Sequence, residues 1–172
     1  MRKNKTFNCT STALDITNAI RQYEEDAFER HKETDAFKCG CSIQAGLRTV
    51  AQLLPIARWK SPRRKGLIAS NDPAVVGEIL GVACSAAHER TALAVLCGLS
   101  GVGVPMASAI LTAIDQVRYT VIDRRVLNVL TGNEWDPTVD DYVRYLEFCK
   151  GRAKAYGVSL RNLDRALWTL GA

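Results

Sequence analysis

Apolar residues recur at spacings of three and four along most of the chain, with charged residues between them. Residues 12–31 carry Ala13, Ile16, Ile20, Tyr23, Ala27 and Phe28, and residues 42–57 carry Leu47, Val50, Leu53 and Leu54 before ending at Pro55. This period predicts amphipathic helices. No stretch shows the repeated alternation that is typical of strands, so the sequence predicts an all-α fold.

Residues that favour helix starts precede four further apolar patterns. These predicted N-caps are Asp72, Asp123, Thr138 and Ser159. Pro73 stands at the first helical position after Asp72, and Thr138 with Asp141 forms a predicted capping box for a helix to about residue 156. The helix that follows Asp123 is expected to stop at Gly132.

The longest uncharged run extends from Thr91 to Ile114 and is long enough to cross a membrane. Its centre, however, holds glycines, a serine and Pro105, and no aromatic residues flank it. We therefore expect two short buried helices, at about 88–99 and 105–116, joined by a tight glycine turn. No membrane partner is expected.

The chain of 172 residues fits one domain or two small lobes, and its net charge of +5 favours an acidic partner such as nucleic acid. The start, MRKNKTFNCTST, has basic residues but no apolar segment after them, so no secretory signal and a cytoplasmic location are expected, close to the nucleoid in a prokaryote. The six cysteines are expected to be reduced and to pack as small apolar residues. Cys39-Gly40-Cys41 lacks a second ligand pair, so no metal site is predicted.

The stretch LSGVGVPMASAIL predicts a helix, a tight turn and a second helix. Gly101 and Gly103 permit positive φ and close approach of another backbone, and Val102 between them is expected to anchor the hairpin in the core. Val104 and Pro105 begin a helix whose first amide groups point outward and favour an anion such as a DNA phosphate. A plain helical hairpin without a ligand is the alternative.

Together with the following YTVIDRRVLNVL, this stretch resembles the helix-hairpin-helix DNA glycosylases over residues 85–131. Those proteins carry a similar hairpin, then a helix, then an aspartate that closes a short apolar stretch. Their bifunctional members place a lysine two residues beyond the second hairpin glycine and the aspartate eighteen residues further on. Here these positions are Pro105 and Asp123, with the same spacing.

The resemblance implies a helix-hairpin-helix glycosylase-like fold of two small helical lobes with a cleft between them. The central lobe would span about residues 40–116, and the second would combine 1–39 with 117–172. It also implies DNA as the partner, bound through its phosphates and a flipped base. Pro105 in place of the lysine implies a monofunctional enzyme that uses water. No iron–sulfur cluster is expected, because only Cys149 lies beyond the hairpin, and a monovalent cation at the hairpin is the one ion that the resemblance allows.

Asp123 is the predicted catalytic residue. Breaking an N-glycosidic bond develops positive charge on the sugar, and a carboxylate held beneath it stabilises that charge and orients water. Capping the helix that starts at Arg124 is the structural alternative for Asp123, and the two roles are compatible.

The stretch ARWKSPRRK is the predicted remainder of the DNA-facing surface. It gathers Arg58, Lys60, Arg63, Arg64 and Lys65 around Trp59. The cations would neutralise phosphates, while the indole would stack on a base or fill a gap. A solvated basic loop with Trp59 in the core is equally consistent. Arg124 and Arg125 beside Asp123 would grip phosphates or lower its pKa, and Trp135 and Trp168 are expected to pack in the core or between lobes.

Two other classes of function remain open. The first is a DNA-binding module that keeps the hairpin but performs no chemistry. The second is a structural helical protein that binds a protein partner. Depth of a pocket beside Asp123 would favour the enzyme. No motif names the base that is removed, and none indicates an oligomeric state.

Overall fold

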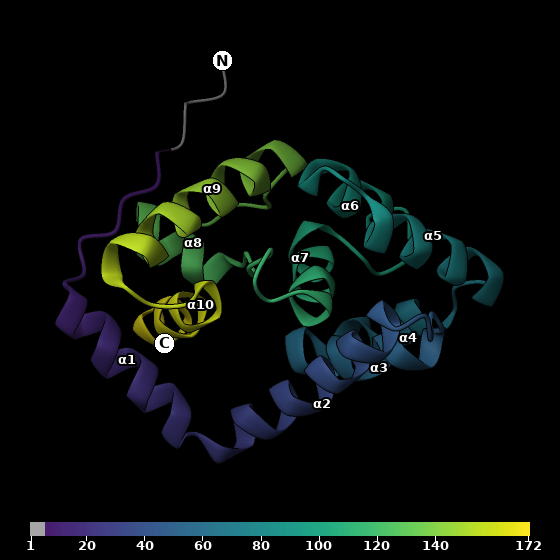
Figure 1. Ribbon diagram of the computed structural model, residues 1–172, viewed down its shortest axis with the longest axis horizontal. Helices are drawn as coiled ribbons and strands as arrows, with labels where there is room; N and C mark the ends of the chain where they lie inside the picture. The colour runs from purple at the N-terminus through teal and green to yellow at the C-terminus, as the bar shows by residue number, and fades with distance from the viewer. Residues whose placement is uncertain (1–5) are drawn as a thin grey trace.

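The computed structural model describes residues 6–172, and every regular element in that range is a helix (Figure 1). The elements are α1 (Ala13–Glu25), α2 (Ala27–Gln44), α3 (Val50–Lys60), the 3-10 helix η1 (Pro62–Arg64), α4 (Lys65–Ala69), α5 (Pro73–Ser85), α6 (Glu89–Leu96), α7 (Val104–Ile114), α8 (Arg124–Thr131), α9 (Val139–Tyr156) and α10 (Leu160–Leu170). The all-α prediction is confirmed. Residues 1–5 lie outside the described range. They begin both the MRKNKTFNCTST stretch and the predicted second lobe.

All four predicted N-caps are confirmed. The Asp72 carboxylate accepts hydrogen bonds from the first amides of α5, and the Ser159 hydroxyl accepts one in α10. Thr138 and Asp141 form a reciprocal capping box at the start of α9. Gly132 ends α8 in the left-handed conformation. These side chains satisfy amides that have no partner inside their helices, which fixes where each helix begins.

The predicted boundaries in the first third of the chain are wrong. The expected single helix over 12–31 is broken at Asp26, whose carboxylate accepts hydrogen bonds from the amides of Phe28 and Glu29 at 3.1 and 3.0 Å. α2 then continues through Gly40, where a methyl group would overlap the backbone of Ala113 in α7. Gly40 therefore permits close packing of two helices.

The predicted helix over residues 42–57, ending at Pro55, is also wrong, because α2 ends at Gln44 and α3 begins only at Val50. Pro55 lies inside α3, which continues to Lys60, and Pro62 opens the short helix η1. Lys60 is therefore the last residue of α3.

Helix α7 forms the centre of the fold. All of its residues except Pro105 are buried. Helices α2, α3 and α6 pack against it, while α10 packs against α1, α8 and α9. In Figure 1, α7 accordingly lies in the middle of the view, with α9 and α10 on one side and α2 to α4 on the other.

The uncharged run is divided between α6, a turn and α7, as predicted. Among the described residues, no single helix is long and apolar enough to span a membrane, although η1–α4 and α5, bent by 114°, reach that length and composition together. All six cysteines are free. Burial raises the pKa of the Cys84 and Cys97 thiols, as expected for cysteines that pack as apolar residues.

Candidate functional site

The hairpin between α6 and α7 turns at Gly101, which has a φ of +82°. A methyl group there would lie 2.9 Å from Cβ of Leu67 and 3.1 Å from Cγ1 of Ile68, so Gly101 admits helix α4 as well as the turn. Val102 is buried, as predicted. Gly103 has a φ of −95° and not a positive value, which corrects that part of the prediction.

Gly103 is the N-cap of α7 and leaves open space at the start of that helix. The nearest atom to a methyl group at Gly103 would be Cδ of Pro105, at 4.0 Å. The first helical hydrogen bond joins the Ala107 amide to the Gly103 carbonyl at 2.9 Å. The amides of Val104 and Met106 precede it and have no partner within the helix, which is the arrangement by which helix N-termini in general favour anions.

The segment Tyr119–Ile122 crosses the core in an extended form that is neither helix nor strand. Three of its backbone polar groups form hydrogen bonds with side chains. Tyr142 and Tyr145 of α9 donate their hydroxyls to the carbonyls of Thr120 and Val121 at 3.1 and 2.9 Å. The Ile122 amide donates to Oγ of Ser108 in α7 at 3.1 Å. These bonds fix the position of the next residue, Asp123.

Asp123 caps α8 and also forms an ion pair with α3. Its Oδ1 accepts the Val126 amide at 2.9 Å, while Nζ of Lys60 donates to its Oδ2 at 2.8 Å. The two side chains are only 18% and 13% exposed. Burial alone would raise the pKa of Asp123, but Lys60, the Val126 amide and Arg125 together lower it below its ordinary value. Asp123 is therefore an ionised carboxylate at neutral pH.

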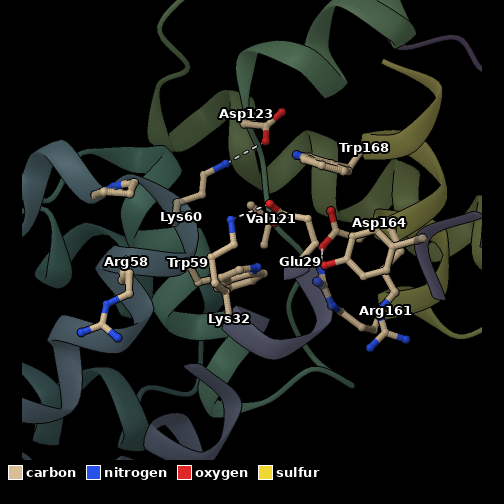
Figure 2. A pocket seen from close by; sticks show the side chains of 13 residues that line it. Glu29, Lys32, Arg58, Trp59, Lys60, Val121, Asp123, Arg161, Asp164 and Trp168 are labelled. Atoms are coloured by element: carbon tan, nitrogen blue, oxygen red, sulfur yellow. Dashed lines mark hydrogen bonds and ion pairs between the residues drawn. The ribbon is translucent and has the colours of Figure 1, made fainter. Parts of the chain in front are cut away.

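A cavity of about 270 Å³ opens beside Asp123 (Figure 2). Its lining includes Trp59, Lys60, Val121, Asp123, Asp164 and Trp168. In Figure 2 the Lys60 side chain reaches toward Asp123, while Trp59 and Trp168 come from different helices. The sequence singled out Asp123 but contained no signal for the cavity, since its walls come from separate parts of the chain.

The two cavity tryptophans each have an arginine over one ring. Arg161 lies 5.1 Å from the ring centroid of Trp59, and Arg125 lies 4.4 Å from that of Trp168. Trp59 is partly buried and also contacts Phe37 edge-on at 5.7 Å. Trp168, expected only to pack, lines this cavity as well.

A second hollow, of about 620 Å³, is also lined by Asp123. The predicted DNA-binding residues that line it are Lys60, Arg63, Arg64, Gly101, Gly103, Val104, Pro105, Arg124 and Arg125. We call this hollow the basic groove. Four predicted residues lie elsewhere: Val102 is buried in the core, Arg58 and Trp59 line the cavity, and Lys65 lines neither the cavity nor the groove. Arg124 forms an exposed ion pair with Asp136 at 2.8 Å.

A buried charge network around Glu33 contributes side chains to the cavity wall. Glu33 Oε1 accepts from Nε of Arg161 at 3.0 Å and from Nη2 of Arg165 at 2.6 Å, while its Oε2 accepts the Tyr23 hydroxyl at 2.6 Å. Arg161 also pairs with Asp164. Burial alone would raise the pKa of Glu33, but the two arginines and the Tyr23 hydroxyl lower it to about 2. No sequence motif indicated this network.

Among residues 6–172, no group of three or more histidine, cysteine, aspartate or glutamate side chains is arranged to hold a metal ion. The hairpin, Asp123 and most of the predicted cations lie around the cavity and the basic groove. Comparison with family models, with curated proteins and with solved structures finds no match to the chain.

Proposed function

We propose that this protein is a DNA-binding base-excision protein, a DNA N-glycosylase that hydrolyses the bond between the sugar and a damaged or modified base. One observation carries the proposal: Asp123 lies where the cavity and the basic groove meet, and it lines both. An acid at that junction faces the sugar of a strand whose phosphates occupy the groove and whose base occupies the cavity.

The basic groove supplies the binding. Arg63, Arg64 and Arg125 neutralise backbone phosphates, and the amides at the start of α7 receive one phosphate oxygen. Such contacts position the strand without reading its sequence. The open space beside Gly103 lets a phosphate approach these amides closely.

The cavity receives the base. An enzyme that acts on a base in a duplex must take it out of the stack, and a cavity with aromatic walls compensates part of the lost stacking. Trp59 and Trp168 supply such walls here. An arginine already lies over each indole ring, so a base would stack on the part of each ring that the arginine leaves uncovered.

Asp123 performs the charge stabilisation. As the base departs, positive charge develops on the sugar, and an ionised carboxylate beneath it lowers the barrier. Its lowered pKa keeps that charge present at neutral pH. Water is the nucleophile of this step, because Pro105 offers no amine at the start of α7.

The proposal includes a helix-hairpin-helix glycosylase-like arrangement. Its two lobes, about 40–116 and 1–39 with 117–172, would enclose the cleft, and the hydrolysis needs no cofactor. We further propose that the protein works in the cytoplasm, where it meets DNA.

A non-catalytic DNA-binding module is the second candidate. Both carboxylate oxygens of Asp123 are already engaged, one by the Val126 amide and one by Lys60. A purely structural cap would show the same contacts. The groove would then bind DNA while the cavity stayed unused.

A panel of oligonucleotides separates the two candidates. Each duplex bears one alkylated, oxidised, deaminated or otherwise modified base, and alkali after incubation cleaves any abasic site that has formed. We expect alkali-dependent cleavage at one class of lesion. Binding to DNA without cleavage anywhere in the panel favours the non-catalytic module.

A further inference from the structure

One face of helix α10 forms a wall of the cavity. The residues of α10 that line the cavity are Arg161, Asp164, Arg165 and Trp168. They stand at positions i, i+3, i+4 and i+7, so they share one face of the helix. Figure 2 shows Asp164 and Trp168 entering the cavity from this helix and Lys60 entering it from another. The wall therefore combines an aromatic ring with charged groups.

Asp164 is a buried acid with one unused oxygen. Its side chain is only 4% exposed, and Arg161 donates a hydrogen bond to its Oδ2. Among residues 6–172, no group donates a hydrogen bond to its Oδ1. A buried acceptor without a donor is costly in a folded protein. Because Asp164 lines the cavity, a ligand that carries an N–H group removes that cost.

The other two described acids that line the cavity, Glu29 and Asp123, are placed differently. Both oxygens of Asp123 already accept hydrogen bonds. Glu29 pairs with Lys32 of its own helix, and its side chain is 18% exposed, so water reaches it. Asp164 is therefore the acid whose free oxygen a base inside the cavity would meet.

We propose that Asp164 selects the base, and that the cavity takes a base that carries an exocyclic amino group on its six-membered ring. The proposal rests on the proposed function in one respect, namely that the cavity receives a base. It adds the substrate class: damaged or modified bases that keep their amino group are accepted, and bases that have lost it by deamination are rejected.

The chemistry of a carboxylate gives this preference its direction. An ionised carboxylate accepts hydrogen bonds and donates none. An amino group projects two N–H donors beyond its neighbours on the ring, and one of them can reach Oδ1. A carbonyl oxygen in the place of the amino group would turn lone pairs toward the carboxylate, and a methyl group would leave Oδ1 unpaired. A site built around one polar partner rejects the analogue that lacks it.

The charge state of Asp164 adds a pH dependence. Burial raises the pKa of its carboxyl to about 6, although Arg161 and Lys60 oppose the rise. The negative charges of Asp123 and Glu33 add to it. The neighbouring groups of α1 and α9 do not titrate in this range, since burial raises the pKa of Tyr23, Tyr142, Tyr145 and Cys149.

Protonation converts the free oxygen of Asp164 from an acceptor to a donor. Above about pH 6 the carboxylate is ionised, and Oδ1 accepts. Below that pH the proton binds to Oδ1, because Oδ2 accepts from Arg161. The preference for an amino group should therefore weaken as pH falls through this value.

Free purines test the selection without DNA and without base release. The probes form two pairs of equal size, 9-methyladenine with 6,9-dimethylpurine and 2-amino-9-methylpurine with 2,9-dimethylpurine. Within each pair a methyl group replaces the amino group. Binding is followed by tryptophan fluorescence, because Trp59 and Trp168 line the cavity. In at least one pair we expect the parent protein to bind the amino member about 10- to 100-fold more tightly at about pH 7.5, and by a smaller factor at about pH 5.5.

Asp164→Asn reverses the polarity of the free position. Its carbonyl oxygen is expected to face Arg161, which only donates, so its amide N–H faces the cavity. We expect this variant to lose the preference for the amino member or to favour the methyl member. Asp141→Asn is the matched control, because Asp141 is a buried, ion-paired acid of α9 outside the cavity, and it should keep the parent's preference.

Four results overturn the proposal: no binding of any probe, equal binding within both pairs by the parent, a preference that does not weaken at the lower pH, or one that persists in a folded Asp164→Asn protein. Base release in the oligonucleotide panel by a parent protein without this preference would remove the role of Asp164 and leave the glycosylase standing. The preference without release of any base would do the reverse.

Discussion

Replacing Glu33 by glutamine tests the buried network that supports the cavity. Glu33 is 4% exposed and its carboxylate accepts bonds from Arg161, Arg165 and the Tyr23 hydroxyl. Glutamine keeps the shape but removes the charge, which leaves two arginines with only Asp164 as a buried counterion. Lowering the pKa from 4.5 to about 2 corresponds to about 3 kcal/mol of folding free energy. Removing one partner of a buried pair typically costs about 3–5 kcal/mol, so the two values agree.

The pH dependence of this loss has a definite sign. Because the folded-state pKa of Glu33 is lowered, its contribution is complete above about 4.5 and disappears as pH falls toward about 2. Equilibrium denaturation in urea should therefore show Glu33→Gln to be less stable than the parent by about 3 kcal/mol at pH 7, with a smaller difference at pH 3. A difference below about 0.5 kcal/mol at pH 7, or one that grows as pH falls, would refute this account of the network.

Three further predictions concern the hairpin, the groove and the support of Asp123. Gly103→Val should fold like the parent and bind DNA more weakly, because the added side chain fills open space at the start of α7. Gly101→Val should instead lower thermal stability, because Gly101 has a positive φ and contacts α4. Equal DNA affinity in a folded Gly103→Val protein would place the hairpin away from DNA. Changing Arg63 and Arg64 together to alanine should reduce the salt slope of DNA binding by about 2, measured by fluorescence anisotropy, and an unchanged slope would remove the groove from the interface. Tyr145→Phe leaves the buried Val121 carbonyl without its donor and should cost about 1–3 kcal/mol in urea denaturation, against no change if that bond is dispensable.

The helix ends that the sequence predicted well are those set by local chemistry. Asp72, Thr138 and Ser159 each satisfy amides within three residues of themselves, so neighbouring residues suffice to locate them. The break at Asp26 was missed although the same chemistry produces it, because an apolar period continues across it through Ala27 and Phe28. Periodicity locates helical faces better than it locates interruptions.

The candidate site likewise contains some residues that local sequence predicted and others that it did not. Asp123 and the hairpin lie within one short stretch of sequence, so spacing alone selected them. Lys60 lies 63 residues before Asp123, and their ion pair exists only because α3 continues past Pro55 and packs beside α7. Glu33 and Arg161 are separated by 128 residues. Such pairings depend on tertiary packing, which no local pattern in the chain encodes.

The central claim is that Asp123 removes a base, and a single-turnover comparison of the parent with Asp123→Asn tests it most directly. Asparagine keeps the shape and much of the cap on α8 while removing the charge that faces the sugar. On the lesion that the parent processes, we expect DNA affinity to survive and base release to slow by roughly 10²-fold or more. Base release at the parent's rate by a folded Asp123→Asn protein would contradict the account.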